Sequence, residues 1–278
     1  MSNSFPYQLS ISLVVYNSKP AILLPLLNSI KQITIPVKLI VSDNSTEPLL
    51  KELFESYDAE YIFNNANLGY GKAHNVAINK GKHLAPYHLV VNPDVVINKN
   101  CIEDGLAYLN ANKNVGLLMP KVLYPDGEIQ RLCKLLPTPF DLMFRRFIPA
   151  FLSPLFKASL GRYELQSKDY NKPMVLNNLS GCFMLMSHEA LQKVGAFDEH
   201  FFMYLEDTDL SRRISSQFQA IYYPQISIIH NYEKGSYKSK KLLSYHIQSA
   251  FYYFGKWGWF IDADRRRKNK VVLAQIQP

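Results

Sequence analysis

Short runs of β-forming residues alternate with segments of helical periodicity along the first part of the chain. Residues 9–16 form an apolar, β-rich run that ends at Asn17-Ser18, and apolar residues then recur at helical spacing from Pro20 to Ile30. The same order repeats, with strands predicted at residues 37–41, 60–63 and 87–91 and helices at 48–56, at about 70–80 and at about 99–110. This alternation predicts a mostly parallel central sheet covered by helices on both faces, a doubly wound α/β fold.

The pattern changes after a fifth predicted strand at residues 115–119. Residues 131–172 are basic, aromatic and interrupted by prolines, which favours a flap, an acceptor loop or a membrane-contacting insertion over an inner strand. Regular structure is expected again in a strand region at 174–186, helices beginning near 187 and 206, a strand at 220–229 and an aromatic helix at 240–259.

The composition fits a globular protein, because 47% of the 278 residues are hydrophobic. No apolar stretch approaches the roughly 20 residues that cross a bilayer. Residues 1–8 lack a basic start followed by an apolar run, so no secretory signal and a cytoplasmic location are expected. Cys101, Cys133 and Cys182 match neither a zinc site nor a disulfide framework, so we expect free thiols.

The formal net charge of +8 indicates an anionic partner. Much of the excess is clustered, above all in Arg265-Arg266-Arg267-Lys268. Such a cluster is either an ordinary solvated face or a contact with a membrane surface. No recognised nucleic-acid-binding module accompanies the charge, so nucleic acid is not an expected partner.

Polar residues follow the carboxyl ends of the predicted strands, where open α/β sheets bind their ligands. They are Asn17, Asp43, the loop 67–72 and the turn Asn92-Pro93-Asp94. A hard cation that bridges a diphosphate prefers a carboxylate such as Asp94, although Asn-Pro-Asp is also a favoured turn. We therefore expect these four loops to converge on one crevice.

The segment from Asn67 to Asn75 contains Gly69 and Gly71 in front of a predicted helix. These glycines permit close approach of the backbone to a phosphate, and Lys72 supplies positive charge; the alternative is an ordinary glycine-rich turn. His74 stands where a dinucleotide fingerprint has its third glycine, so this segment is not such a fingerprint. An NAD-dependent dehydrogenase is disfavoured because the first predicted strand is followed by Tyr16-Asn17-Ser18 and not by a glycine fingerprint.

Three carboxylates, Glu206, Asp207 and Asp209, occur within four positions at a predicted helix start. They could complement the helix dipole, with Asp209 and Arg213 as an i,i+4 pair. The functional interpretation is that one carboxylate acts as a general base while its neighbour orients an acceptor hydroxyl. His230 ends an apolar strand and is either structural or, together with Asp94, part of a metal site.

Taken in order, these motifs resemble the family-2 glycosyltransferases, in particular the rhamnosyltransferase-like branch that builds O-antigens and related polysaccharides. The resemblance extends from about Leu9 to Tyr232. It is carried by Val14-Val15-Tyr16-Asn17, Val41-Ser42-Asp43-Asn44-Ser45, Asn67-Leu68-Gly69-Tyr70-Gly71, Asn92-Pro93-Asp94, Gly195-Ala196-Phe197-Asp198-Glu199 and Glu206-Asp207-Thr208-Asp209-Leu210.

The resemblance implies a Rossmann-like nucleotide-sugar fold of the GT-A type and an inverting displacement at the anomeric carbon. Asp207 would be the catalytic base, Glu206 would contact the acceptor, and Asp94 with His230 would hold Mg²⁺ or Mn²⁺. Residues expected to bind the donor are Tyr16, Asn17, Asp43, Gly69, Gly71, Lys72, Asn75, Asn92 and Asp94. Many relatives carry two aspartates around the metal where this chain has Asn92, which bears on its dependence on metal.

The resemblance also implies a division of the chain and a set of partners. Residues 1–235 would form the catalytic domain, with the nucleotide sugar bound by 1–119 and the acceptor by 120–235, and residues 236–278 would form a helical, basic segment. The first expectation for the donor is dTDP-rhamnose, followed by UDP-linked sugars, and for the acceptor a lipid-linked saccharide. Trp257, Trp259 and the basic run would attach the chain to the inner face of the membrane. The alternative is a catalytically inactive nucleotide-sugar-binding or membrane-surface module of the same fold.

Overall fold

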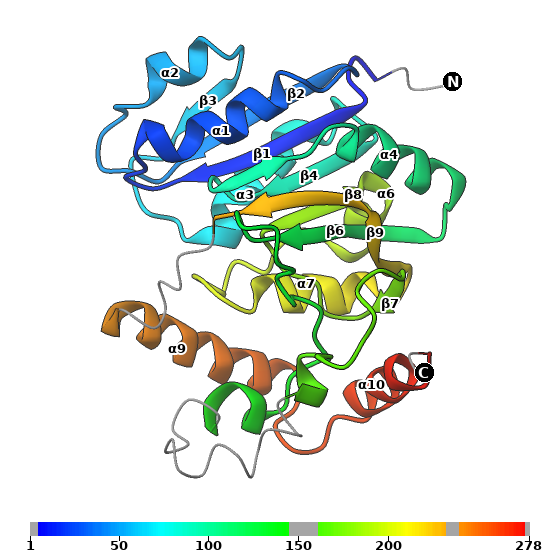
Figure 1. Cartoon of the computed structure of the whole chain (residues 1–278). Coiled ribbons are helices and arrows are strands. Elements are labelled where there is room, and N and C mark those ends of the chain that lie inside the picture. Colours follow the sequence, from blue (N-terminus) through cyan, green and yellow to red (C-terminus); the bar gives the residue numbers. More distant parts are fainter. Residues whose placement is uncertain (1–4, 145–160, 232–238, 276–278) are drawn as a thin grey trace.

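The computed structural model describes residues 5–144, 161–231 and 239–275. Its centre is a nine-stranded sheet with the order β3-β2-β1-β4-β8-β6-β9-β5, and β7 pairs with β9 outside this path (Figure 1). The strands are β1 (Leu9–Val15), β2 (Val37–Asp43), β3 (Glu60–Phe63), β4 (Tyr87–Val91), β5 (Val95–Ile97), β6 (Val115–Leu123), β7 (Met174–Leu176), β8 (Phe183–Ser187) and β9 (Gln219–His230).

The first half of the sheet is parallel, as the strand–helix alternation predicts. β1 lies between β2 and β4, and the ends of the strands are in register, with Val15 beside Asp43 and Leu13 beside Val91. The second half is mixed, because β8 is antiparallel to both β4 and β6 while β6 and β9 are parallel. The expected α/β fold is therefore confirmed, with a sheet that is parallel throughout only in its first four strands.

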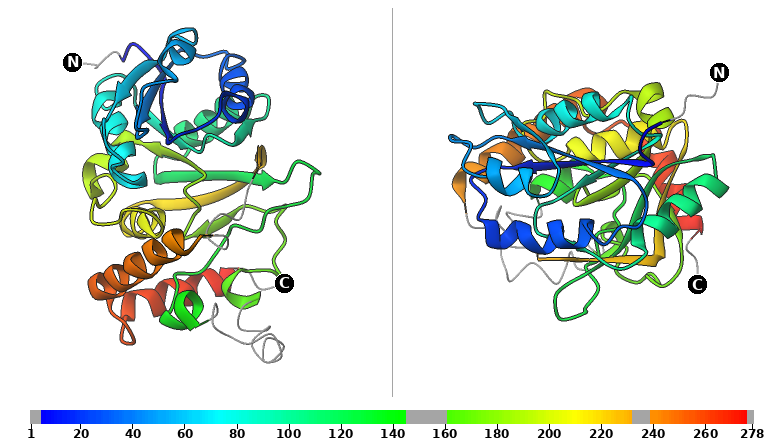
Figure 2. Two further views of the ribbon diagram at one scale, coloured as in Figure 1. Left: turned by 90° about the vertical axis from the view of Figure 1, so that its left-hand side faces the viewer. Right: turned by 90° about the horizontal axis from the view of Figure 1, so that it is seen from above.

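Helices cover both faces of the sheet (Figure 2). One apolar cluster joins the sheet to α1, α2 and α4, and a second joins the opposite face to α3, α6, α7 and α10. Along β1 the alternation of side chains directs Leu9, Ile11 and Leu13 into the first cluster. The helices are α1 (Pro20–Ile30), α2 (Lys51–Glu55), α3 (Tyr70–Gly81), α4 (Cys101–Ala111), α6 (His188–Val194), α7 (Glu206–Ile214), α9 (Lys240–Trp257) and α10 (Ala263–Gln275).

The segment around residues 131–172 contributes a short π-helical turn at Phe140–Phe144, and residues 145–160 lie outside the described part. The three cysteines are buried and free, as expected.

The C-terminal segment is helical, as expected, and lies beneath the sheet and beside α7 (Figure 1). The basic run 265–268 does not form one exposed face, because Arg265 and Lys268 are buried while Arg266 and Arg267 are exposed. Among the described residues, no helix combines the length and hydrophobicity needed to cross a membrane.

Candidate active site

A cavity of about 840 Å³ opens at the carboxyl ends of the parallel strands, where the sequence predicts a crevice. Each predicted strand-end loop contributes at least one lining residue. The polar and aromatic lining includes Tyr16, Ser18, Asn44, Asn67, Gly69, Tyr70, Asn92, Asp94, Tyr124 and Asn231. The expectation that these loops converge is therefore fulfilled.

The two N-terminal loops are fixed to each other by hydrogen bonds behind the cavity. The backbone N–H of Asn17 donates to Oγ of Ser45 at 2.8 Å, and Asn17 adopts a left-handed conformation. Asp43 is fully buried, and its carboxylate accepts hydrogen bonds from the Ser45 N–H and the Tyr61 hydroxyl. Neither Asn17 nor Asp43 lines the cavity, so their observed role is to shape these loops.

Gly69 lines the cavity, and its backbone requires glycine. Its φ angle is +82°, and a Cβ atom there would lie 2.2 Å from the carbonyl oxygen of Phe202. The neighbouring Tyr70 N–H donates to the same Phe202 oxygen at 2.8 Å, and Asn44 donates to the Gly69 carbonyl at 2.9 Å. The glycine-rich loop is thereby held between the second strand end and the loop that precedes α7.

The structure gives three other predicted donor-binding residues a different environment. Gly71 packs against Phe197, and the side chain of Asn75 forms hydrogen bonds with both backbone groups of Phe197 at 2.9 and 3.0 Å. Lys72 forms an ion pair with Glu199 at 3.5 Å. None of these three lines the cavity, because α3 directs them toward the segment that follows α6.

Asp94 and His230 lie side by side because β5, which the sequence analysis did not anticipate, pairs with the end of β9. Val95 is in register with His230, and Nε2 of His230 lies 3.4 Å from Oδ1 of Asp94. The side-chain amide of Gln130 donates to the His230 carbonyl at 2.6 Å, and its Oε1 lies 3.0 Å from Nδ1 of the same histidine. This orientation of the amide makes Nδ1–H the donor, and Nε2 is the ring nitrogen that faces Asp94.

An imidazole nitrogen and a carboxylate oxygen that face each other in this way are the donor types that bind a shared cation. Mg²⁺ and Mn²⁺ are commonly held by one or two protein groups together with substrate phosphates, so a two-residue donor set fits such an ion. The described ranges contain no group of three or more histidine, cysteine or acidic side chains that could hold a metal by themselves.

Asn92 is engaged by Tyr70. The Tyr70 hydroxyl lies 3.0 Å from Oδ1 of Asn92 and 2.7 Å from the carbonyl oxygen of Gly181. Burial, with the neighbouring carboxyl groups of Glu206 and Asp207 next in importance, raises the pKa of this hydroxyl well above its ordinary value, so it remains a donor. Asn92 thus accepts a hydrogen bond at the wall of the cavity and is one of its lining residues.

Asp207 lies on the other side of Gly181. The Gly181 N–H donates to Oδ2 of Asp207 at 2.8 Å, and the Thr208 N–H donates to Oδ1 at 2.7 Å. Asp207 and Glu206 line a second cavity of about 190 Å³, to which Asn178 and other polar residues contribute. The carboxylate is therefore fixed at the wall of a small polar cavity next to the larger one.

Glu206 is almost completely buried, and its Oε2 atom has no hydrogen-bond partner among the described residues. Burial, with the charge of Asp207 second, raises the pKa of Glu206 well above its ordinary value. A protonated carboxyl at this place can donate a hydrogen bond to an oxygen of a ligand in the small cavity.

Tyr70 and Gly181 therefore form the boundary between the two cavities. Both Asp94 and Asp207 contribute to the electrostatic potential at the Tyr70 hydroxyl, and both do so at the buried Cys182 thiol. The two carboxylates that the sequence singles out lie on the two sides of this boundary, each at the wall of its own cavity.

The sequence analysis did not select Tyr70, Gly181 or Gln130. Tyr70 stands between the two glycines of the glycine-rich loop, which was the available signal. Gly181 lies between two small residues before β8 and gave only a weak indication of close backbone packing. Gln130 had no signal, because its role depends on a register between distant strands.

The chain belongs to glycosyl transferase family 2, whose family model matches residues 10–195. It is 28% identical over 210 residues to an N-acetylglucosaminyl-diphospho-decaprenol L-rhamnosyltransferase of Mycobacterium tuberculosis, covering 70% of this chain and 67% of that protein. It is 26% identical over 227 residues to the rhamnosyltransferase WbbL of Escherichia coli, covering 79% and 82% of the two chains. The protein is thus a family-2 glycosyltransferase whose relatives include rhamnosyltransferases.

Solved structures share the GT-A-like fold. GalNAc-T7 with UDP, GalNAc and Mn²⁺ superposes with a TM-score of 0.61 at 15% identity, over 82% of this chain and 43% of that one. The mannosyltransferase PcManGT of Pyrobaculum calidifontis, in complex with GDP-Man and Mn²⁺, gives a TM-score of 0.59 at 13% identity, over 90% and 65%. The chain therefore spans less than half the length of GalNAc-T7.

Proposed function

We propose that this protein is an inverting glycosyltransferase that moves a sugar from a nucleotide diphosphate to a saccharide acceptor. The observation that carries the proposal is the pair of neighbouring cavities divided by Tyr70 and Gly181, with Asp94 on the larger one and Asp207 on the smaller. The larger cavity has room for a nucleotide sugar. The smaller one offers a carboxylate and polar groups for an acceptor sugar.

The donor occupies the large cavity. Tyr16 is about half exposed there and offers a ring on which a nucleobase can stack. The first candidate is dTDP-rhamnose, because the two relatives described above are named rhamnosyltransferases, and UDP-linked sugars come second. Asn17 and Asp43 contribute to donor binding indirectly, because they fix the shape of the loops that line the cavity.

Asp94 and His230 would hold the divalent cation, Mg²⁺ or Mn²⁺. The two structural neighbours described above contain Mn²⁺, which accords with this choice. When bound, such a cation neutralises charge on the leaving diphosphate. Gln130 keeps His230 in the tautomer and orientation that this role requires.

Asp207 removes the proton from the attacking hydroxyl of the acceptor. The N–H groups of Gly181 and Thr208 fix both oxygens of the carboxylate, which leaves its remaining lone pairs for the hydroxyl. Glu206, kept protonated by its burial, donates a hydrogen bond that orients the acceptor. Attack from the side of the smaller cavity on a sugar held in the larger one inverts the anomeric centre.

Replacement of Asp207 by asparagine tests the proposal. We expect the Asp207→Asn variant to lose about 10²- to 10⁴-fold in kcat, because this is the usual contribution of a general base. The assay follows release of dTDP from dTDP-rhamnose with a lipid-linked N-acetylglucosamine acceptor. Binding of dTDP with Mn²⁺ should remain within about twofold, since Asp207 does not line the large cavity. Unchanged turnover contradicts the assignment, and a parent protein that binds donor without turnover supports the inactive-module alternative.

The acceptor is lipid-linked and the protein attaches peripherally to the inner face of the membrane. A cavity of about 990 Å³ is lined by exposed cations, among them Arg266 and Lys270, and by Trp259 and Phe260. Phe260 and Ile261 are 74% and 84% exposed beside it. Cations next to exposed apolar side chains suit an anionic membrane surface. Within the predicted basic run, Arg265 is buried but contributes to the wall of this cavity, whereas Lys268 is buried and does not line it.

A further inference from the structure

The chain adopts an unfavourable conformation immediately before the helix that carries Asp207. Tyr204 and Leu205 have φ angles of +74° and +68°, in the left-handed region that non-glycine residues rarely adopt. Leu205 occupies the N-cap position of α7 and offers no side-chain hydrogen bond to the helix. Contacts from elsewhere must therefore hold the start of α7 in place.

Helix α9 supplies contacts to this loop. The Ser249 hydroxyl donates to the carbonyl oxygen of Met203 at 2.8 Å. Aromatic residues of the loop contact α9 at Tyr252, Tyr245 and His246, and a separate apolar cluster joins loop and helix. The members of that cluster are Phe201, Leu205, Ala250, Tyr253 and Phe254.

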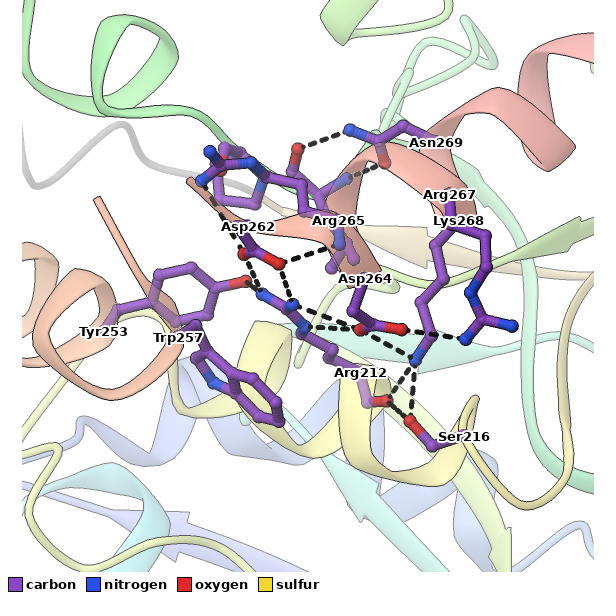
Figure 3. A network of polar contacts seen from close by, with 12 residues as sticks. Arg212, Ser216, Tyr253, Trp257, Asp262, Asp264, Arg265, Arg267, Lys268 and Asn269 are labelled. Carbon is purple, nitrogen blue, oxygen red and sulfur yellow. Dashed lines mark hydrogen bonds and ion pairs between the residues drawn. The ribbon is translucent and has the colours of Figure 1, made fainter. Parts of the chain in front are cut away.

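The last turn of α7 is tied to the segment between α9 and α10 by Arg212, whose side chain is 1% exposed. Its guanidinium donates to both oxygens of Asp262 at 2.7 and 2.8 Å and to Asp264 at 3.1 and 3.2 Å (Figure 3). The same group lies 4.1 Å from the centre of the Trp257 ring. We call Arg212, Trp257, Asp262 and Asp264 the α7 clamp.

Both ends of α7 are attached to the same C-terminal segment. In the first turn, the Trp257 indole N–H and the Lys256 ammonium both lie 2.8 Å from Oδ1 of the buried Asp209. At the last turn, the Lys268 ammonium donates to the Arg212 carbonyl at 2.9 Å (Figure 3). The helix is thereby held in its first turn and in its last turn by the C-terminal segment.

We propose that Arg212 is a positioning residue for glycosyl transfer, acting through the α7 clamp on Asp207; this rests on the proposed role of Asp207 as the base. Arg212 lines neither cavity of the candidate site, so its influence is exerted through the placement of α7. The clamp keeps the Asp207 carboxylate against the Gly181 N–H. A displacement of a catalytic group by about 1 Å can lower the rate by about 10²-fold.

The substitution Arg212→Lys is the sharpest test of the positioning role. A compact ammonium keeps the charge but cannot form the two-pronged contact with Asp262 while also reaching Asp264. We expect Arg212→Lys to lower kcat about 10- to 100-fold with dTDP-rhamnose and the lipid-linked acceptor. Binding of dTDP with Mn²⁺ should stay within about twofold of the parent. Arg267→Lys is the matched control, because Arg267 also contacts Asp264 but is 73% exposed, and it should retain parental kcat.

The pH profile separates positioning from loss of folded protein. If α7 shifts, the Gly181 N–H donates less well to the ionised Asp207, and the acid limb of the kcat profile moves to higher pH. A smaller folded fraction lowers kcat equally at all pH values. If Arg212→Lys does not fold, Asp264→Asn decides: it removes the more exposed partner of the clamp, keeps the pair with Asp262, and should show the same direction of shift with a smaller loss.

The outcomes distinguish this proposal from the function on which it rests. Turnover that persists in Asp207→Asn overturns the role of Asp207 and the positioning role with it. A second outcome overturns the positioning role alone. In that outcome Asp207→Asn loses turnover, while the folded clamp variant keeps kcat within twofold of the parent and the acid limb of its pH profile does not move.

Discussion

Nε2 of His230 lies 3.4 Å from Oδ1 of Asp94, at the junction where the short strand β5 pairs with the end of β9. The two groups are held there by backbone register and, on the histidine, by the amide of Gln130. These two groups would hold the proposed divalent cation on the diphosphate of the donor. This geometry gives a direct test of metal use.

We expect His230→Gln to lower the affinity for Mn²⁺ in the presence of dTDP by at least about tenfold. Gln130→Met leaves both protein ligands in place but removes the amide that orients His230. It should lower the affinity for Mn²⁺ about 10- to 100-fold, which is the usual effect of losing a group that hydrogen-bonds to a metal ligand. Calorimetric titration of Mn²⁺ measures both. His200→Gln is the control, since His200 is 74% exposed and does not line the cavity, and equal losses in all three variants would contradict the assignment.

Substitution of Gly69 tests the close approach between the glycine-rich loop and the loop before α7. In Gly69→Ala, the alanine would have a φ of +82° and a Cβ atom 2.2 Å from the Phe202 carbonyl oxygen. We expect a loss of more than about 2 kcal/mol in the free energy of unfolding, together with weaker binding of dTDP. Urea denaturation and thermal shift measure the two effects.

Gly127→Ala is the matched control for this variant. Gly127 has a similar φ of +89°, but an added Cβ there meets nothing within 4 Å. Gly127→Ala should lower the free energy of unfolding only by the cost of the left-handed backbone conformation, about 1 to 2 kcal/mol, and should keep its affinity for dTDP. Equal losses in the two alanine variants would contradict a steric role for Phe202.

Three buried histidines predict sensitivity to acid. Burial lowers the pKa of His74 to about 3 and of His188 to about 4, and it lowers that of His88 well below the ordinary 6.5, with His188 as the second cause. Their Nε2 atoms have no hydrogen-bond partner among the described residues. The unfolded chain therefore binds more protons than the folded one below about pH 6.5.

The stability that these neutral histidines contribute is present above pH 6.5 and is lost as the pH falls toward 4. Each group contributes at most about 1.4 kcal/mol per pH unit to the slope. Urea denaturation between pH 7 and 4.5 should show this slope, and His74→Gln should reduce it. The exposed His83 provides the control variant His83→Gln, which should change the slope much less, because His83 is only the last of the causes that shift the pKa of His188. A slope that His74→Gln does not alter would contradict the prediction.

Binding to membranes should depend on Arg266 and Lys270. The double variant Arg266→Gln/Lys270→Gln should lower binding to vesicles containing anionic lipid by about tenfold or more, since each cation near such a surface contributes about 1 kcal/mol. Vesicle flotation measures this. The double variant Lys51→Gln/Lys80→Gln changes the charge equally at exposed positions that lie outside this cavity. An equal effect of both would indicate a general response to charge.

Much of the fold followed from the pattern of the sequence, because strand and helix periods are local properties. The parallel strands β1 to β4 and the helices behind them lie close to the predicted ranges. β5 was not predicted, since three residues after a turn carry no periodic signal and only pairing with β9 makes them a strand. The antiparallel insertion of β8 between β4 and β6 likewise depends on contacts between distant segments.

The candidate site was predicted in part, for the same reason. Asp94, Asp207 and Glu206 were selected because clustered carboxylates at element ends are visible in the sequence, and the structure brings them to two neighbouring cavities. Lys72 and Asn75 stand in the same motif as Gly69, but the turn of α3 directs them to Glu199 and Phe197. The sequence motif alone does not distinguish Gly69, which lines the cavity, from Lys72 and Asn75, which do not; the three-dimensional path of the chain does.

The attachment of α9 and α10 to α7 limits how this enzyme can be recombined with its relatives. A chimera that receives the C-terminal segment of another family member must also receive the matching residues of α7 at the positions of Asp209 and Arg212. Otherwise charged side chains will be buried without the partners that pair with them. The natural unit of exchange is thus α7 together with the two C-terminal helices, rather than the tail alone.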